Sequence, residues 1–179
     1  MKTSRVTLRK MEGRFIKSRT GRGAPSKKPE VGEMKSGDYD SVFSLWKRSE
    51  NLGLSGADSP ENIQRHMRRN PGLSLVAREN GSVVGAILCG HDGRRGYLHH
   101  LAVDRKSRKK GIGQALVEEC LARLEKLGIQ RCHIFIFARN EKGKKFWRAL
   151  GWRERPELRM MSIDLGSLSP SRFPSGRSV

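Results

Sequence analysis

Hydrophobic residues recur along the middle of the chain at two different spacings, which indicate strands in some segments and helices in others. A strand is predicted over residues 30–34. The next predicted element is a helix, because the apolar side chains of "VFSLW" fall on one side of it. Asp38 or Asp40 is expected to cap its start, and Gly53 is expected to end it. A second, short helix is predicted over residues 59–70, since its Ser-Pro-Glu start favours helix capping.

Strand-like runs dominate residues 73–103. Asn80-Gly81 separates two of them and is a strong signal for a tight hairpin. A second turn at "HDGRRG" returns the chain as "YLHHLAV". This segment is therefore predicted to form a three-stranded antiparallel meander.

The second half of the chain alternates between helices and strands. A helix is predicted over residues 112–127, with its apolar side chains on one face and Gly128 at its end. A strand at residues 131–138, a helix at 141–150 and a last strand near residues 158–165 follow. A meander followed by this alternation predicts an α/β (α+β) fold, in which helices flank a mixed, mostly antiparallel central sheet.

The two ends of the chain differ in composition from the middle. Residues 1–29 are rich in Lys and Arg, and residues 167–179 consist mostly of Ser, Pro, Gly and Arg. Both are predicted to be disordered extensions of one domain over residues 30–166, because neither offers enough apolar surface to offset the entropy lost on ordering. An organellar presequence is an open alternative for the N-terminal extension.

Charge and cysteine content limit the possible partners and compartments. The net charge of +19 favours contact with polyanions, including weak and non-specific nucleic-acid binding, without identifying a partner. No apolar run is long enough to cross a membrane. The three cysteines have neither metal-site spacing nor a disulfide framework, which favours a reducing, cytoplasmic setting.

The segment "RKSRKKGIGQ" places basic residues and two glycines between a predicted strand and a predicted helix. A helix N-terminus exposes unpaired backbone N–H groups and a partial positive charge, and glycine lets a ligand approach that backbone closely. Gly111 and Gly113, preceded by Arg108, Lys109 and Lys110, therefore favour binding of a pyrophosphate. A solvated basic loop that caps an ordinary helix is the alternative. A Rossmann loop is disfavoured by the antiparallel strands before it, and no P-loop sequence follows.

Two motifs together resemble the GCN5-related N-acetyltransferase (GNAT) superfamily. Its acetyl-CoA loop, Arg/Gln-x-x-Gly-x-Gly/Ala, matches Arg108-x-x-Gly111-x-Gly113. Its later motif, Asn-x-x-Ala-x-x-(Phe/Leu)-Tyr-x-x-x-Gly-(Phe/Tyr), is similar to "NEKGKKFWRALGW" from Asn140 to Trp152. The stretch "GHDGRRGYLHHLAV" is also similar to the YpeA-like bacterial branch of the superfamily. The resemblance implies the GNAT fold and acetyl-CoA as cosubstrate, without a metal.

The resemblance also implies a set of cofactor-binding residues. The backbone of residues 101–103 would bind the pantetheine arm and the thioester carbonyl, and the backbone N–H groups of residues 109–114 would bind the pyrophosphate. Asn140 would reach the pantetheine end from the next strand–helix junction. The predicted set is Leu101, Ala102, Val103, Arg108, Lys109, Lys110, Gly111, Ile112, Gly113, Gln114, Asn140, Gly143 and Trp147.

Acetylation of an alkylamine first requires the loss of a proton. Holding an amine of pKa near 10.4 as its free base at pH 7 costs about 4–5 kcal/mol. On the strand "YLHHLAV", alternation predicts that Tyr97 and His99 face one way and His100 the other. Related aralkylamine acetyltransferases have histidines at the positions of Tyr97 and His99, and histone acetyltransferases have a general-base Glu at that of Tyr97. The resemblance therefore makes His99 the predicted base, directly or through water, with Tyr97 beside it. A hydrogen-bonded strand histidine without a chemical role is the alternative.

Trp147 stands where many members of the superfamily have a Tyr that protonates the leaving thiolate. An indole N–H does not supply a proton at useful pH. Because the CoA thiolate is a fairly good leaving group, transfer is expected to survive at a cost of roughly 10²-fold, with Tyr97 or water as a substitute.

The sequence thus predicts an N-acetyltransferase that works by direct transfer in a ternary complex. It is expected to act, as a monomer or homodimer, on a small amine or a protein amino group. The alternative is a CoA-binding or nucleic-acid- and ribosome-associated module that kept the fold and lost catalysis.

Overall fold

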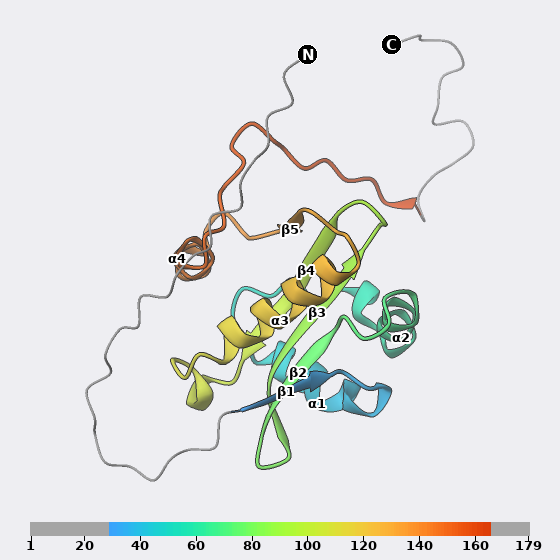
Figure 1. The fold of residues 1–179 in the computed structure, drawn as a ribbon, viewed down its shortest axis with the longest axis vertical. Coiled ribbons are helices and arrows are strands. Elements are labelled where there is room, and N and C mark those ends of the chain that lie inside the picture. The colour runs from blue at the N-terminus through green and yellow to red at the C-terminus, as the bar shows by residue number, and fades with distance from the viewer. Residues whose placement is uncertain (1–28, 166–179) are drawn as a thin grey trace.

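The computed structural model describes residues 29–165, which form one sheet with helices on both of its faces (Figure 1). The strands are β1 (Glu30–Glu33), β2 (Leu75–Glu79), β3 (Ser82–His91), β4 (Gly96–Val103) and β5 (Cys132–Ile134). The α-helices are α1 (Tyr39–Lys47), α2 (Pro60–Arg69), α3 (Ile112–Lys126) and α4 (Glu141–Ala149), and short 3₁₀ turns are η1 (Ser36–Asp38), η2 (Gly56–Asp58) and η3 (Arg105–Ser107). The extensions predicted at 1–29 and 167–179 lie outside the described residues, apart from residue 29.

The sheet has the strand order β1-β2-β3-β4-β5. Neighbouring strands are antiparallel from β1 to β4, and β4 and β5 are parallel. Asn80 and Gly81 both have positive φ, at 50° and 79°, and make the tight turn between β2 and β3 that their sequence predicts. The prediction of a mixed, mostly antiparallel sheet flanked by helices is confirmed.

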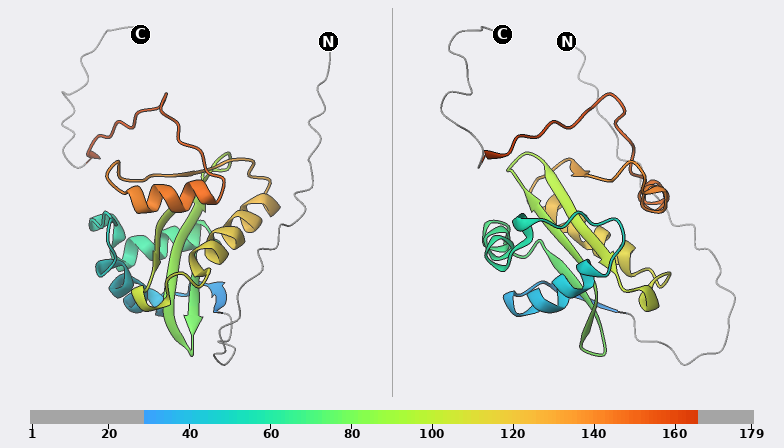
Figure 2. Two further views of the ribbon diagram at one scale, coloured as in Figure 1. Left: turned by 90° about the vertical axis from the view of Figure 1, so that its left-hand side faces the viewer. Right: turned by 180° about the vertical axis from the view of Figure 1, so that it is seen from behind.

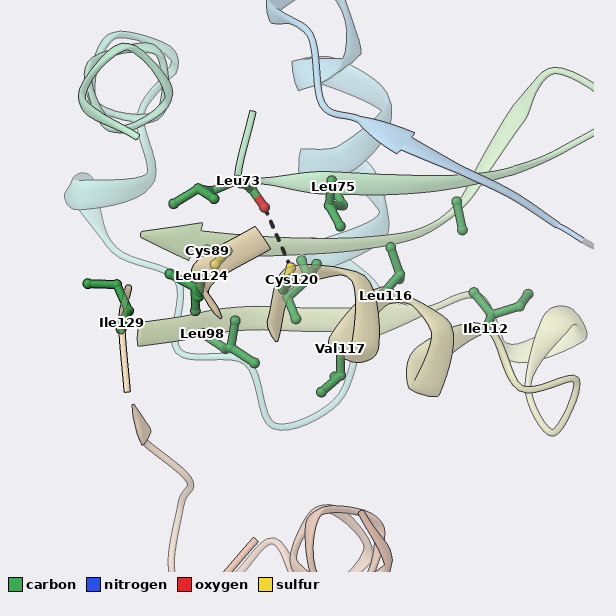
Figure 3. Packing of buried hydrophobic residues seen from close by; sticks show 12 residues of the cluster. Leu73, Leu75, Cys89, Leu98, Ile112, Leu116, Val117, Cys120, Leu124 and Ile129 are labelled. Carbon is green, nitrogen blue, oxygen red and sulfur yellow. Dashed lines mark hydrogen bonds between the residues drawn. The ribbon is translucent and has the colours of Figure 1, made fainter. Parts of the chain in front are cut away.

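Helix α3 covers one face of the sheet, and α1 and α2 cover the other (Figure 2). The apolar side of α3 packs on β2, β3 and β4, and Figure 3 shows this cluster from close by. A Cβ would lie 2.9 Å from the Ile112 side chain at Gly85 of β3 and 2.6 Å from the Leu124 side chain at Gly96 of β4, so the helix packs tightly on the sheet where these strands have glycine. The buried α3 residues are Ile112, Leu116, Val117, Cys120 and Leu124.

The opposite face is built around α1. Val42, Leu45 and Trp46 of this helix are fully buried, and they pack on β2, β3 and β4 together with Ile63 of α2. The helix starts where the apolar pattern predicts, but it ends at Lys47 rather than at Gly53.

Two residues explain the early end of α1. The Ser49 hydroxyl donates a hydrogen bond to the Leu45 carbonyl at 2.7 Å. Asn51 has a φ of 60°, in the left-handed region. Short polar side chains favour such turns over a continued helix, so the predicted extension to Gly53 was wrong.

The last predicted strand does not form. The chain over residues 158–165 carries no strand hydrogen bonds and exposes its apolar side chains, Met161 by 94%. Within residues 29–165, β5 pairs with β4 alone, and its other edge is not extended by residues 158–165. β5 itself spans Cys132–Ile134 rather than 131–138, because its partner residues on β4 are limited to 96–98.

No helix in the described part of the chain combines the length and the apolarity needed to span a bilayer.

Candidate active site

The glycine-rich segment becomes the N-terminus of α3. Gly111 is the N-cap residue, with a φ of 80°, and Lys109 two residues earlier is also left-handed, with a φ of 62°. The amide of Ala115 donates to the Gly111 carbonyl at 3.0 Å. The N–H groups of residues 112–114 lie in the turn before this bond, where a helix offers them no acceptor. They are therefore available as hydrogen-bond donors at this end of the helix, as the predicted pyrophosphate site requires.

The cations before this helix have different partners. Lys110 pairs with Glu79 at 3.1 Å, and Arg108 donates from Nε to the Val103 carbonyl at 3.1 Å. Arg105 pairs with Glu50. Among residues 29–165 the ammonium of Lys109 has no such partner, and its side chain is exposed. Lys109 is thus the predicted phosphate-binding cation with the fewest competing contacts.

A groove of about 340 Å³ opens beside this loop. It lies between the C-terminal end of α1 and the end of β4, and its rim carries the ion pair of Arg48 with Asp104, at 3.3 Å. The groove is lined by Leu45, Arg48, Ser49, Val103, Asp104, Arg105, Lys106 and Arg108. The predicted phosphate loop therefore borders an open groove, half of whose lining residues are Lys or Arg.

Strands β4 and β5 separate beyond their first three residue pairs. The parallel register joins residues 96–98 to 132–134 and then stops. The backbone of Leu101, Ala102 and Val103 thus faces no strand on this side within the described chain. Leu101 and Val103 point toward α3, whereas Ala102 is buried on the α1 side. The three residues predicted to bind pantetheine lie along this open edge.

Asn140 caps helix α4. Its Oδ1 accepts a hydrogen bond from the Gly143 amide at 2.9 Å. A Cβ at Gly143 would lie only 2.6 Å from Asn140 Nδ2 and would clash with it. Glycine therefore stands at this position, where the family pattern has alanine. The cap occupies the side-chain oxygen of Asn140 and leaves its amide nitrogen for other contacts.

Trp147 belongs to an aromatic cluster on α4. Its ring meets those of Phe146 and Trp152 edge-on, with centroids 5.2 and 5.0 Å away. A Cβ at Gly113 would lie 3.4 Å from Phe146, an ordinary van der Waals distance, so α4 lies next to the start of α3 without requiring glycine there. Trp147 therefore has a packing role besides the cofactor contact predicted for it.

His99 and His100 lie on the same face of the sheet, contrary to the alternation predicted from the sequence. His99 is opposite Leu88, which packs with α1 and α2, and the His100 ring meets that of Trp46 at 5.0 Å. The register between β3 and β4 shifts after His99, and His100 adopts a φ of 52°. This bulge turns His100 to the α1 side, so the prediction that the two histidines face apart was wrong.

The surroundings of His99 suit a neutral imidazole. Burial lowers its pKa, as do the neighbouring His100 and His66, while Asp58 acts in the opposite direction. Within residues 29–165 neither of its ring nitrogens has a hydrogen-bond partner. The rings of His99, Tyr97 and Phe135 form a cluster in which His99 lies 6.3 Å from Tyr97 and 6.2 Å from Phe135, so the predicted base and Tyr97 do lie side by side.

Asp58 is the site residue that sequence reasoning missed. Its carboxylate lies 2.6 Å from the ring of His100 and only 7% of its side chain is exposed. The residue stands in "GADSPEN", where Ser59 carries the visible helix-capping signal. A contact between residues 42 positions apart leaves no local signal in the sequence.

Two of the three cysteines have a raised thiol pKa, and the described part of the chain has no cluster of side chains that could hold a metal ion. Burial raises the pKa of the Cys132 thiol to about 12, and that of Cys120 is also raised, first by its contact with Cys89. A thiol with so high a pKa stays protonated at neutral pH. No three His, Cys, Asp or Glu side chains of residues 29–165 converge on one point.

Known proteins are similar to this chain in sequence and in fold. The pattern of the acetyltransferase (GNAT) family matches residues 39–152. An acetyltransferase of Photorhabdus laumondii subsp. laumondii is 39% identical over 102 residues, which cover 57% of this chain and 68% of that protein.

Two solved structures have the same fold. The ribosomal-protein-S18-alanine N-acetyltransferase of Escherichia coli superposes with a TM-score of 0.61, at 20% identity, over 71% of this chain and 79% of its own. The PaiA N-acetyltransferase of Thermoplasma acidophilum, solved with coenzyme A, superposes with a TM-score of 0.61 at 19% identity. The match covers 69% of this chain and 89% of that protein. Since the family pattern matches more than half of its length, this chain belongs to the GNAT family of acetyltransferases.

Proposed function

We propose that this protein transfers the acetyl group of acetyl-CoA directly to a primary amine. The observation that carries the proposal is the N-terminus of α3, where left-handed Lys109 and Gly111 leave the next backbone N–H groups free of helix partners. Such an end binds phosphate oxygens through N–H donors and the helix dipole. The open edge of β4 runs away from it toward the histidines, along a path that suits a long, flexible thiol carrier.

The residues of this chain have separate tasks toward acetyl-CoA. The amides of residues 112–114 bind the pyrophosphate, with the Lys109 ammonium beside them. The free edge of β4 over residues 101–103 accepts the pantetheine arm, and Asn140 contributes its side-chain nitrogen from the opposite side. When bound, the cosubstrate supplies the thioester whose acetyl carbonyl the amine attacks.

His99 is the proposed base for the acceptor amine. Its half-buried imidazole is neutral at pH 7, because burial and two neighbouring histidines lower its pKa. Removing the proton from an alkylammonium of pKa near 10.4 is the step that needs such a group. Tyr97, stacked beside it, covers one side of the approaching amine.

Direct transfer needs no nucleophile from the protein. The two cysteines with raised pKa, Cys120 and Cys132, remain protonated and take no part. Trp147 is packed between Phe146 and Trp152 and donates no proton to the leaving sulfur. The CoA thiolate therefore leaves with help from solvent or from groups on the acceptor side.

The acceptor is a small amine or an amino group of a protein. The E. coli protein of the same fold acts, by its name, on the alanine of a ribosomal protein. The net charge of +19 favours an acceptor that is itself anionic or bound to a polyanion, because such a partner is attracted over a long range.

The test is release of CoA thiol from acetyl-CoA by the pure protein. The acceptors offered are benzylamine, spermidine, a peptide with N-terminal alanine and poly-L-lysine, each against an amine-free blank. At least one acceptor is expected to raise thiol release well above the blank, with the acetylated amine found by mass spectrometry. Tight CoA binding without transfer to any acceptor, combined with salt-sensitive RNA binding, contradicts the proposal and supports a binding module instead.

A further inference from the structure

Asp58 and His100 form a buried pair on the α1 side of the sheet that the reaction described above does not use. His100 Nε2 lies 2.6 Å from Asp58 Oδ1, and the two side chains are 17% and 7% exposed. The contact joins η2 to the bulge of β4 across 42 residues of sequence. A carboxylate is buried at a cost unless partners compensate it, so the pair calls for an explanation.

Asp58 is held firmly in place. Its Oδ2 accepts the Ser55 amide at 2.8 Å, and its own carbonyl accepts the Tyr39 hydroxyl at 2.9 Å. A carboxylate only accepts hydrogen bonds, so the ring nitrogen of His100 that faces it carries the hydrogen. In the neutral ring the lone pair then belongs to Nδ1. The structure thus fixes which nitrogen of His100 accepts a proton.

The Nδ1 atom of His100 has no hydrogen-bond partner among residues 29–165. It is not fully buried, in a side chain that is 17% exposed. The Trp46 ring meets that of His100 edge-on at 5.0 Å. The imidazole is therefore positioned by a carboxylate on one side and by an indole on another, which is how a base is oriented in a hydrogen-bonded catalytic pair.

The chemistry of amine acetylation has two protons to remove. An alkylammonium loses the first before it attacks the thioester, and its nitrogen loses the second as the amide forms. His99 is proposed for the first. No partner has yet been named for the second, and Trp147 does not exchange protons with the leaving sulfur.

We propose that His100, oriented by Asp58, accepts the second of these protons. The inference rests on the proposed transfer to an amine. The nitrogen–carbon bond forms at the acetyl carbonyl, the carbon–sulfur bond breaks, and the sulfur leaves with the bonding electron pair. The proton of the new amide nitrogen passes to Nδ1, and the resulting imidazolium is paired with the Asp58 carboxylate. That proton then goes to the thiolate or to solvent, which restores the neutral ring.

The first arm of the test compares two acceptors, benzylamine and methoxyamine, of which the second is already neutral at pH 7.5. His100→Asn keeps the left-handed backbone, because asparagine adopts it more readily than other residues with side chains. This variant is expected to lower kcat about 10²-fold with both acceptors, with CoA affinity unchanged within about twofold. A kcat within threefold of wild type contradicts the proposal. A loss confined to benzylamine assigns His100 to the first proton and also overturns it.

The second arm does not depend on turnover. Long-range ¹H–¹⁵N spectra of the imidazole nitrogens are expected to show hydrogen on Nε2 of His100 in the wild-type chain, and a shift toward the Nδ1–H form in Asp58→Asn. A wild-type ring with hydrogen on Nδ1 contradicts the inference. Absence of thiol release from the wild type with any amine contradicts the proposed function, whereas these spectra still decide whether Nδ1 is free.

The matched control is Asn62→Ala. The Asn62 side-chain amide donates to the Gly56 carbonyl of η2 at 2.9 Å, a bond that involves neither Asp58 nor His100. Asn62→Ala therefore loosens η2 without changing the pair, and its kcat is expected to stay within threefold of wild type, whereas Asp58→Asn is expected to lower kcat about 10²-fold. If Asn62→Ala loses as much kcat as Asp58→Asn, the effect of Asp58 is structural and the proposed role is wrong.

Discussion

Replacing Gly111 by valine weakens CoA binding at least ~30-fold. A residue with a side chain pays about 1–2 kcal/mol in the left-handed region that Gly111 occupies, more if it is β-branched, and each 1.4 kcal/mol is tenfold in affinity. The strain moves the loop away from the conformation that aims the α3 amides at a phosphate. Isothermal titration calorimetry of CoA into both proteins measures the difference.

Gly128→Val is the matched control at the other end of the same helix. Gly128 has a φ of 76° and, like Gly111, no atom within 4 Å of a Cβ placed on it. Both variants are therefore expected to lower Tm by similar amounts, but Gly128→Val leaves CoA affinity within about twofold of wild type. Equal losses of affinity in the two variants contradict the placement of the pyrophosphate at Gly111.

His99→Ala lowers turnover at least ~10²-fold while CoA affinity stays nearly unchanged. A base positioned near the amine contributes about this factor to the chemical step and little to binding of the cosubstrate. Steady-state rates with the fastest acceptor, together with calorimetric titration, separate the two effects. Wild-type rates in this variant remove His99 from the mechanism.

The pH dependence gives a second signature of His99. Its pKa lies below the ordinary value of 6.5, because burial and the nearby His100 and His66 disfavour the charged ring. The imidazole is therefore neutral above that value, and kcat/KM of the wild type is expected to fall only as the pH drops below 6.5. His133→Ala serves as control, since the His133 ring lies against that of Tyr97 but has no proposed role in proton transfer. Its kcat/KM is expected to follow the same pH profile as that of the wild type. A kcat/KM that falls already between pH 8 and 7 in both the wild type and His100→Asn contradicts the assignment, because His100 no longer contributes to the profile of that variant.

Local patterns in the sequence were sufficient for most of the scaffold. Asn80-Gly81 specifies its hairpin because few residues adopt two successive left-handed conformations. The apolar stripe of residues 112–127 matches α3 almost to its end, since one helix face packs on the sheet throughout. The start of α3 after Gly111 was also predictable, because a helix N-terminus after glycines follows from chain order alone.

The surroundings of His99 and His100 were less predictable, because they depend on contacts between segments that are distant in the sequence. The bulge that turns His100 to the α1 side arises from the register between β3 and β4, and alternation along one strand does not reveal it. Asp58 reaches His100 only after the α1–α2 connection has folded against the sheet. The strand expected near residues 158–165 failed for a related reason, since pairing requires a neighbour that no local pattern supplies.

The most direct test of the account is an NMR titration of the backbone amides with CoA. The largest chemical-shift changes are predicted for residues 109–114, at the N-terminus of α3, and they should saturate together with the calorimetric binding curve. CoA binding that leaves these amides unchanged and shifts others, or no binding at all, contradicts the placement on which the proposed reaction depends.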